Sequence, residues 1–160
     1  MNPPTQARIE ADPTVPAIRI SREFSATPAQ LLRAHTDPEI FARWVGPASL
    51  TTEILEWDAR DGGCWRYVAR RGSEEFGFRG CFHTVREDRI VQTFTWEGQP
   101  DGVALETMTF TELGDGRTRL DAFSLTDSFE GRDQWLRSGM ETGVDEGYAA
   151  LDRLIAEGAL

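Results

Sequence analysis

Residues 132–160 read RDQWLRSGMETGVDEGYAALDRLIAEGAL, and this stretch decides the fold. With about 100° between successive residues, its apolar side chains fall on one side of a helix and most of its charged side chains on the other. The stretch therefore predicts one long amphipathic helix that crosses a small domain. The apolar side of that helix holds Met140, Val144, Gly147, Tyr148, Leu151, Leu154 and Ile155.

Three glycines recur in this helix at intervals of four residues: Gly139, Gly143 and Gly147. Each glycine costs a helix interior roughly 0.5–1 kcal/mol relative to alanine, so a stripe of three needs a reason. Two interpretations remain open, and both can hold. The helix approaches a sheet closely along the stripe, or the missing side chains leave room beside a ligand cavity. We expect Gly147 to be a packing glycine and Gly143 to border the cavity.

The first part of the chain predicts a tail, a strand and two short helices. Residues 1–16 are rich in proline and poor in apolar residues, so we expect a disordered tail ahead of one domain over residues 17–160. Residues 18–25 alternate as a strand that turns Arg22 inward, where a buried charge needs a carboxylate or a ligand. Thr27-Pro28 and Asp37-Pro38 are two helix starts in succession.

The middle of the chain alternates apolar and polar residues between tight turns, which predicts antiparallel strands. Their aromatic face must be buried, and the C-terminal helix is the largest element available to cover it. The sequence therefore predicts an α+β domain with a curved antiparallel sheet and two short helices after the first strand. The strands of the middle part are expected at residues 52–57, 64–70, 76–85, 89–96, 104–113 and 117–125.

Three segments together resemble the START-like (SRPBCC) superfamily. They are ISREFSATPAQLLRAHTDPEIFARWVGP at residues 20–47, DARDGGCWRY at 58–67 and SGMETGVDEGYAALDRLIAEG at 138–158. Within the superfamily, the chain is similar to the family named for homology to the activator of the heat-shock chaperone ATPase, over residues 18–157. The resemblance implies a helix-grip fold, in which the sheet wraps around the long C-terminal helix and leaves an interior cavity. It does not specify a reaction, because this fold carries many functions.

Composition restricts the class of partner. Lys and Arg number 17 against 27 Asp and Glu, a net charge of −10, which argues against nucleic acid or an anionic membrane as the main partner. The sequence shows no signal peptide and no run long enough to span a membrane, so we expect a cytoplasmic protein. Cys64 and Cys81 lack further cysteines or histidines at metal spacing, and we expect reduced residues of the core or sheet.

No catalytic, metal or cofactor residue is predicted. The two histidines, His35 and His83, are expected to be surface or sheet residues, and no zinc or dinucleotide motif is present. Glu106 is the carboxylate expected to point inward, because it alternates in step with Met108 and Phe110. Burial would raise its pKa and let it act as an acid or base.

The aromatic interior predicts a binding site for a hydrophobic small molecule, either lipid-like or aromatic and polyketide-like. Two alternatives remain open: a protein-interaction module whose partner is a chaperone, another protein or a second copy of the chain, and a cyclase or hydrolase that uses Glu106. Phe41 and Trp44 are expected to close the mouth of the cavity. The predicted ligand-binding residues are Phe41, Trp44, Tyr67, Phe78, Trp96, Met108, Phe110, Met140, Gly143, Val144 and Tyr148.

Overall fold

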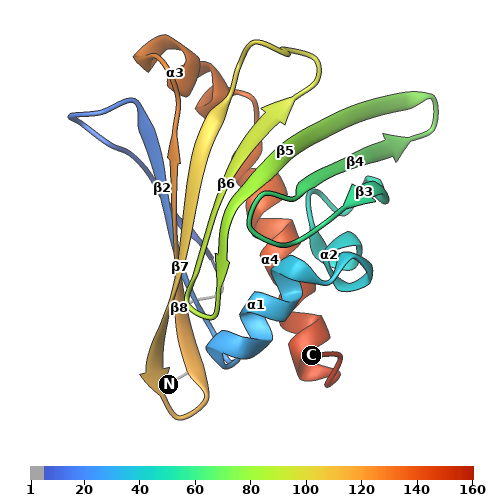
Figure 1. Cartoon of the computed structure of the whole chain (residues 1–160), viewed down its shortest axis with the longest axis vertical. Coiled ribbons are helices and arrows are strands. Elements are labelled where there is room, and N and C mark those ends of the chain that lie inside the picture. The colour runs from blue at the N-terminus through green and yellow to red at the C-terminus, as the bar shows by residue number, and fades with distance from the viewer. Residues whose placement is uncertain (1–5) are drawn as a thin grey trace.

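The computed structural model describes residues 6–160, which form one antiparallel sheet of eight strands and four helices (Figure 1). Neighbours in the sheet follow the order β1-β2-β8-β7-β6-β5-β4-β3. The strands are β1 (Arg8–Ala11), β2 (Ala17–Phe24), β3 (Thr51–Trp57), β4 (Cys64–Arg71), β5 (Glu74–Arg86), β6 (Arg89–Trp96), β7 (Ala104–Gly114) and β8 (Arg117–Leu125). The helices are α1 (Pro28–Thr36), α2 (Pro38–Trp44), α3 (Phe129–Arg137) and α4 (Met140–Ala156).

Two local signals place α1 and α2 directly after β2. The Thr27 side chain accepts a hydrogen bond from the Gln30 backbone N–H, and the Gln30 side chain accepts one from the Thr27 N–H, which is a complete capping box. Asp37 caps α2 by accepting from the Glu39 N–H, 3.0 Å away. These caps confirm the two helix starts predicted from sequence.

The sheet curves around α4, which runs along its concave side (Figure 1), while α2 packs against the same helix and α1 packs against α2 and β7. Strand alternation turns every second side chain toward this interior. The register continues the alternation from strand to strand: Gln92 lies opposite Glu106, and Glu106 lies opposite Ser124. The predicted α+β helix-grip fold is confirmed.

The C-terminal stretch forms two helices, where the sequence predicted one. The first, α3, ends at Arg137, and α4 begins at Met140 after Gly139, whose φ of +88° is left-handed. A right-handed helix cannot pass through such a residue, and glycine adopts it without steric cost. Gly139 therefore marks a corner and does not belong to the glycine stripe.

Contacts with the rest of the domain hold α4 in place. Gly147 faces the end of α2: a Cβ added there would lie 2.9 Å from the Trp44 carbonyl oxygen and 3.3 Å from the Gly46 nitrogen. Close approach of the helix is confirmed at Gly147, although its neighbour is the loop after α2 and not the sheet. Arg22 points inward as predicted and binds the Asp152 carboxylate with both terminal nitrogens, at 2.9 and 2.6 Å.

Residues 6–16 differ from the disordered tail predicted for residues 1–16; the prediction for residues 1–5 lies outside the described part. Arg8–Ala11 form β1, an edge strand that pairs with β2. The buried guanidinium of Arg132 in α3 donates to the carbonyl oxygens of Asp12 and Ala17. Residues 6–16 contain few apolar side chains, and they are held in place by the strand pairing and by the hydrogen bonds from Arg132. Over residues 6–160, no helix is long and apolar enough to cross a membrane.

Candidate ligand site

A cavity of about 140 Å³ lies between the sheet, the two short helices and α4, and we call it the inner cavity. The elements that enclose it come from the whole length of the domain, so it exists only once the sheet has wrapped around α4. The residues that line it are His35, Phe41, Trp44, Val45, Trp57, Trp65, Tyr67, Gln92, Phe94, Glu106, Met108 and Tyr148.

Aromatic rings form most of the wall. Trp65 and Tyr67, two residues apart on β4, lie stacked with ring centroids 5.5 Å apart. Phe41 of α2 packs against Tyr67 at 5.5 Å, which joins the short helices to the sheet. Trp44 and Tyr148 approach to 6.0 Å across the α2–α4 contact. Rings fixed from several sides in this way present flat apolar surfaces of defined orientation.

Glu106 is the acidic group of the cavity, and two cross-strand neighbours bind it. Gln92 of β6 donates to its Oε1 over 3.0 Å, and Ser124 of β8 donates to its Oε2 over 3.3 Å. Burial raises the pKa of the Glu106 carboxyl, against the two hydrogen bonds, which lower it. The predicted inward direction of Glu106 is confirmed, and its environment favours the uncharged acid.

Tyr67 and Tyr148 add two hydroxyl groups. Burial is the main reason why the pKa of each phenol lies above its ordinary value, and the nearby Glu106 carboxylate raises it further. Both hydroxyls therefore stay protonated and can donate a hydrogen bond.

His35 is buried, and the prediction of a surface or sheet residue is wrong for it. Its Nδ1 lies 2.7 Å from the carbonyl oxygen of Leu31, one turn earlier in α1, so this nitrogen carries the proton and donates. Burial lowers the pKa of His35 to about 4. The ring is thus neutral at pH 7, and its Nε2 is left as an acceptor. Its position on the inner side of α1 could have been read from the neighbouring buried Leu31 and Ala34.

Five of the predicted ligand residues line the inner cavity: Phe41, Trp44, Tyr67, Met108 and Tyr148. Six others are not among its lining residues: Phe78, Trp96, Phe110, Met140, Gly143 and Val144. Phe110 is fully packed core, and Gly143 lies next to Pro47, where an added Cβ would be 3.4 Å from the proline Cδ. Sequence reasoning did not include seven of the lining residues among the ligand residues: His35, Val45, Trp57, Trp65, Gln92, Phe94 and Glu106. The strand alternation that turns Glu106 inward also turns Gln92 inward, and that signal was available.

Trp44 is a fixed wall of the cavity. It is 7% exposed, and its indole N–H donates to the carbonyl oxygen of Ala34 over 2.9 Å. This hydrogen bond and its packing against His35, with ring centroids 5.0 Å apart, hold Trp44 inside the wall, whereas the sequence predicted that it closes the mouth of the cavity. Phe41, next to it on α2, is half-buried and lies nearer the surface.

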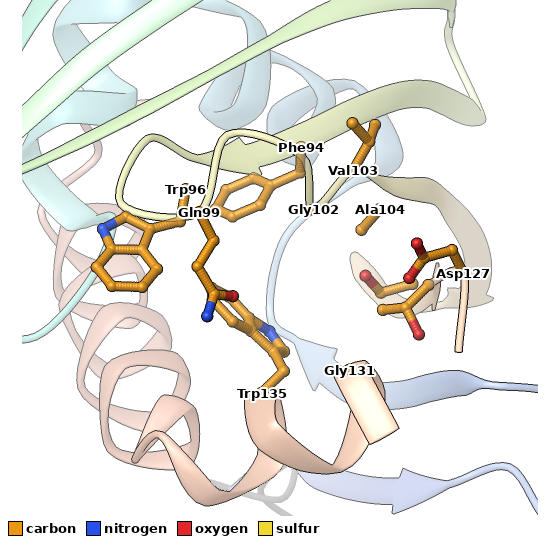
Figure 2. A pocket seen from close by; sticks show the side chains of 11 residues that line it. Phe94, Trp96, Gln99, Gly102, Val103, Ala104, Asp127, Gly131 and Trp135 are labelled. Carbon is orange, nitrogen blue, oxygen red and sulfur yellow. The ribbon is translucent and has the colours of Figure 1, made fainter. Parts of the chain in front are cut away.

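A second, smaller pocket of about 90 Å³ lies between the loop after β6 and α3 (Figure 2). We call it the outer pocket. Figure 2 shows Trp96 and Gln99 on one side of it, Trp135 below and Asp127 opposite. Phe94 lines both spaces, so its ring separates the outer pocket from the inner cavity. Trp96, predicted as a ligand residue, belongs to the outer pocket.

The chemistry available at the inner cavity is that of binding. Its polar side-chain groups are one carboxyl, one imidazole, two phenols, one amide and the indole N–H groups of three tryptophans, and no lysine or arginine lines it. Within residues 6–160, no cluster of three or more histidine, cysteine, aspartate or glutamate side chains could hold a metal ion. The other histidine, His83, contacts Thr84 and lies on β5 away from this cavity.

Comparison with known proteins identifies relatives at the level of family and fold. The sequence model of the family described as Activator of Hsp90 ATPase homolog 1-like protein matches residues 25–156. Comparison with curated proteins finds no match. Many solved structures share the fold, and three of them serve as examples. Protein Ms6760 from Mycobacterium smegmatis is 24% identical, with a TM-score of 0.82 over 92% of this chain and 94% of its own.

The other two come from Rhodobacter sphaeroides and Arthrobacter aurescens. The Rhodobacter protein is 24% identical, with a TM-score of 0.84 over 94% of this chain and 98% of its own. The Arthrobacter protein is 23% identical, with a TM-score of 0.85 over 94% of this chain and 91% of its own. Sequence identities at this level show a shared fold and nothing about function.

Proposed function

We propose that this chain, which belongs to the family of Activator of Hsp90 ATPase homolog 1-like proteins, binds a small, uncharged aromatic molecule in the inner cavity. The observation that carries the proposal is the cavity itself, a space of about 140 Å³ walled by aromatic rings. Apolar pockets with a few well-placed polar groups are the usual sites for small molecules.

The volume sets the size of the ligand. An engineered apolar cavity of about 150 Å³ in another protein binds benzene, so a space of similar size accepts one ring with small substituents. A fatty acid or a polyketide of three or four fused rings is several times larger than that ring. Of the ligand classes predicted from sequence, the dimensions therefore favour a single aromatic ring over the lipid-like and polyketide-like molecules.

The electrostatics favour a ligand without charge. An anion would meet no lysine or arginine in the lining, and it would lie near the Glu106 carboxyl. A cation would lose its hydration, and its one acidic partner is a carboxyl whose pKa is raised by burial. A neutral ring with a hydroxyl group can instead donate to the His35 Nε2 and accept from the Tyr67 or Tyr148 hydroxyl. Phenol and p-cresol have this chemistry.

Calorimetric titration with four ring compounds tests the proposal. Phenol and p-cresol should bind, whereas benzoate and phenyltrimethylammonium, of similar ring size but charged, should bind at least about 10-fold more weakly, a difference of about 1.4 kcal/mol. Tight binding of the cation would instead identify an aromatic cage completed by an ionised Glu106. Absence of binding by all four compounds would reject the proposal.

Two tryptophan substitutions on β7 locate the bound ligand. Met108→Trp adds bulk to the inner cavity, while Leu105→Trp adds it on the outer face, where Leu105 is 45% exposed. Only the Met108 variant should lose affinity for phenol. Equal losses in both variants, with unchanged unfolding midpoints, would place the ligand elsewhere.

Acid chemistry by Glu106 is a second candidate function, which its raised pKa favours. Glu106→Gln keeps the acceptor for Gln92 and removes the acidic proton. A binding protein should keep its affinity for phenol in this variant. An enzyme should convert a bound compound only with Glu106 intact, as mass spectrometry of the ligand after incubation would show.

A further inference from the structure

Cys64 and Cys81 face each other on neighbouring strands. They are direct partners in the β4–β5 register, and their sulfur atoms lie 3.2 Å apart as free thiols. They alternate with Trp65 and Phe82, which are buried in the interior, so both thiols lie on the outer face of the sheet. Cys81 is exposed and Cys64 is half-buried. The chain has two cysteines in total, so each has one intramolecular partner.

The backbone around the pair suits a disulfide. The carbonyl oxygen of Cys64 accepts from the Asp58 N–H, and the N–H of Cys81 donates to the Thr93 side chain, so neither group is directed at the other cysteine. The next pair along the strands carries the ladder hydrogen bond, from the Phe82 N–H to the Gly63 carbonyl oxygen. The cysteines thus occupy a non-hydrogen-bonded pair, in which Cα atoms are about 4.5 Å apart. Disulfides span Cα distances of about 4.4–6.8 Å.

The two thiols are not equivalent. Cys81 is open to solvent and to a reagent in solution. Cys64 is more enclosed, and its pKa is raised, first by its hydrogen bond with Cys81 and then by burial and by the carboxylates of Glu56 and Asp58. Exposure makes Cys81 the thiol that meets an incoming disulfide, and proximity makes Cys64 the thiol that completes the exchange.

We propose that Cys64 and Cys81 form a thiol–disulfide exchange site for low-molecular-weight disulfides such as oxidised glutathione. The Cys81 thiolate attacks one sulfur of the glutathione disulfide, the S–S bond breaks, and one glutathione leaves as a thiolate. The Cys64 thiolate then attacks the Cys81 sulfur and releases the second glutathione. The two cysteine protons pass to the two released thiolates, so two thiols of the protein are oxidised while one glutathione disulfide is reduced to two glutathiones.

The bond would connect β4 to β5 beside the cavity wall, since Trp65 follows Cys64 directly. It would close the chain between positions 64 and 81 and so restrict the unfolded state more than the folded one. The oxidised protein should therefore melt several degrees above the reduced protein. The same bond leaves the inner face of the sheet unchanged, so phenol affinity should be equal in both forms.

Intact mass spectrometry in glutathione redox buffers tests the exchange. Wild-type protein, trapped with an alkylating reagent, should lose both free thiols together, lose the mass of two hydrogen atoms and retain no glutathione. Cys64→Ser should stop at the mixed disulfide and keep one glutathione on Cys81. Cys81→Ser should react more slowly, because Cys64 is the more enclosed thiol.

Three outcomes would overturn the proposal. In the first, the wild-type protein keeps both thiols in excess oxidised glutathione. In the second, it accumulates covalently bound glutathione. In the third, a disulfide joins two chains. The double variant Cys64→Ser/Cys81→Ser is the control for stability: its melting temperature should not respond to the redox buffer. A redox response in that variant would show that the shift comes from elsewhere in the chain.

Discussion

Substitution of Gly147 by alanine should destabilise the protein, because the added methyl group has no space. Its Cβ would lie 2.9 Å from the Trp44 carbonyl oxygen and 3.3 Å from the Gly46 nitrogen. Both are backbone atoms, and Gly46 has a left-handed φ of +79°, so the loop is less free to move than a flexible side chain. Overpacking of this kind costs about 1–3 kcal/mol.

Helix propensity opposes part of that cost. Alanine is about 0.8–1.0 kcal/mol more favourable than glycine in a helix interior, so the net loss at Gly147 should be about 0–2 kcal/mol. Gly143, one turn earlier in α4, is the matched control. Its added Cβ would meet the Pro47 Cδ at 3.4 Å, an ordinary contact, so Gly143→Ala should be neutral or stabilising by up to about 1 kcal/mol.

Urea unfolding followed by tryptophan fluorescence compares the two variants directly. With equal m-values, the midpoint of Gly147→Ala should lie below that of Gly143→Ala by the equivalent of about 1–3 kcal/mol. Both variants replace glycine by alanine in the same helix, so the gain in helix propensity is equal and cancels when their free energies of unfolding are subtracted. A Gly147→Ala protein as stable as Gly143→Ala would refute the close approach of α4 to the loop after α2.

Three further predictions concern charges and the N-terminal strand. Burial lowers the pKa of His35 to about 4, so below pH 6.5 the unfolded state binds a proton that the folded state does not. The free energy of unfolding should therefore fall by about 2–3 kcal/mol between pH 6.5 and pH 4. Denaturant titrations across this pH range should show that His35→Asn removes the loss. Asp152→Asn should lower the free energy of unfolding by about 2–3 kcal/mol at pH 7, because it removes the carboxylate that binds the buried Arg22 guanidinium. In the same unfolding assay, removal of the exposed pair Arg8–Glu10 should lower it by less than about 1 kcal/mol. Deletion of residues 1–14 should lower the melting temperature by several degrees, since it removes β1 and the Asp12 carbonyl that accepts from Arg132; a deletion variant with wild-type melting would show that these contacts contribute nothing.

The sequence predicted those parts of the fold that depend on local rules. Thr27 and Asp37 cap helices through contacts within three residues, and strand alternation is set by backbone geometry alone. The corner at Gly139 is different, because a glycine in an apolar pattern reads equally well as a packing position inside a helix. Whether the chain continues as one helix or turns a corner there depends on how α3 packs against β2 and α4 against α2, which are distant parts of the chain.

The candidate site was predicted less completely, because it depends on register and on packing across the domain. Alternation showed that Glu106 points inward, but its hydrogen bonds to Gln92 and Ser124 require three strands to align to the residue. The burial of His35 was not predicted for the same reason, because it depends on where α1 packs against β7. The ring lies 5.4 Å from that of Phe110, 75 positions later in the chain. The lowered pKa of His35 and the raised pKa of Glu106 therefore arise from the same event, closure of the sheet around α4, and a variant that loosens this closure should return both pKa values toward their ordinary range.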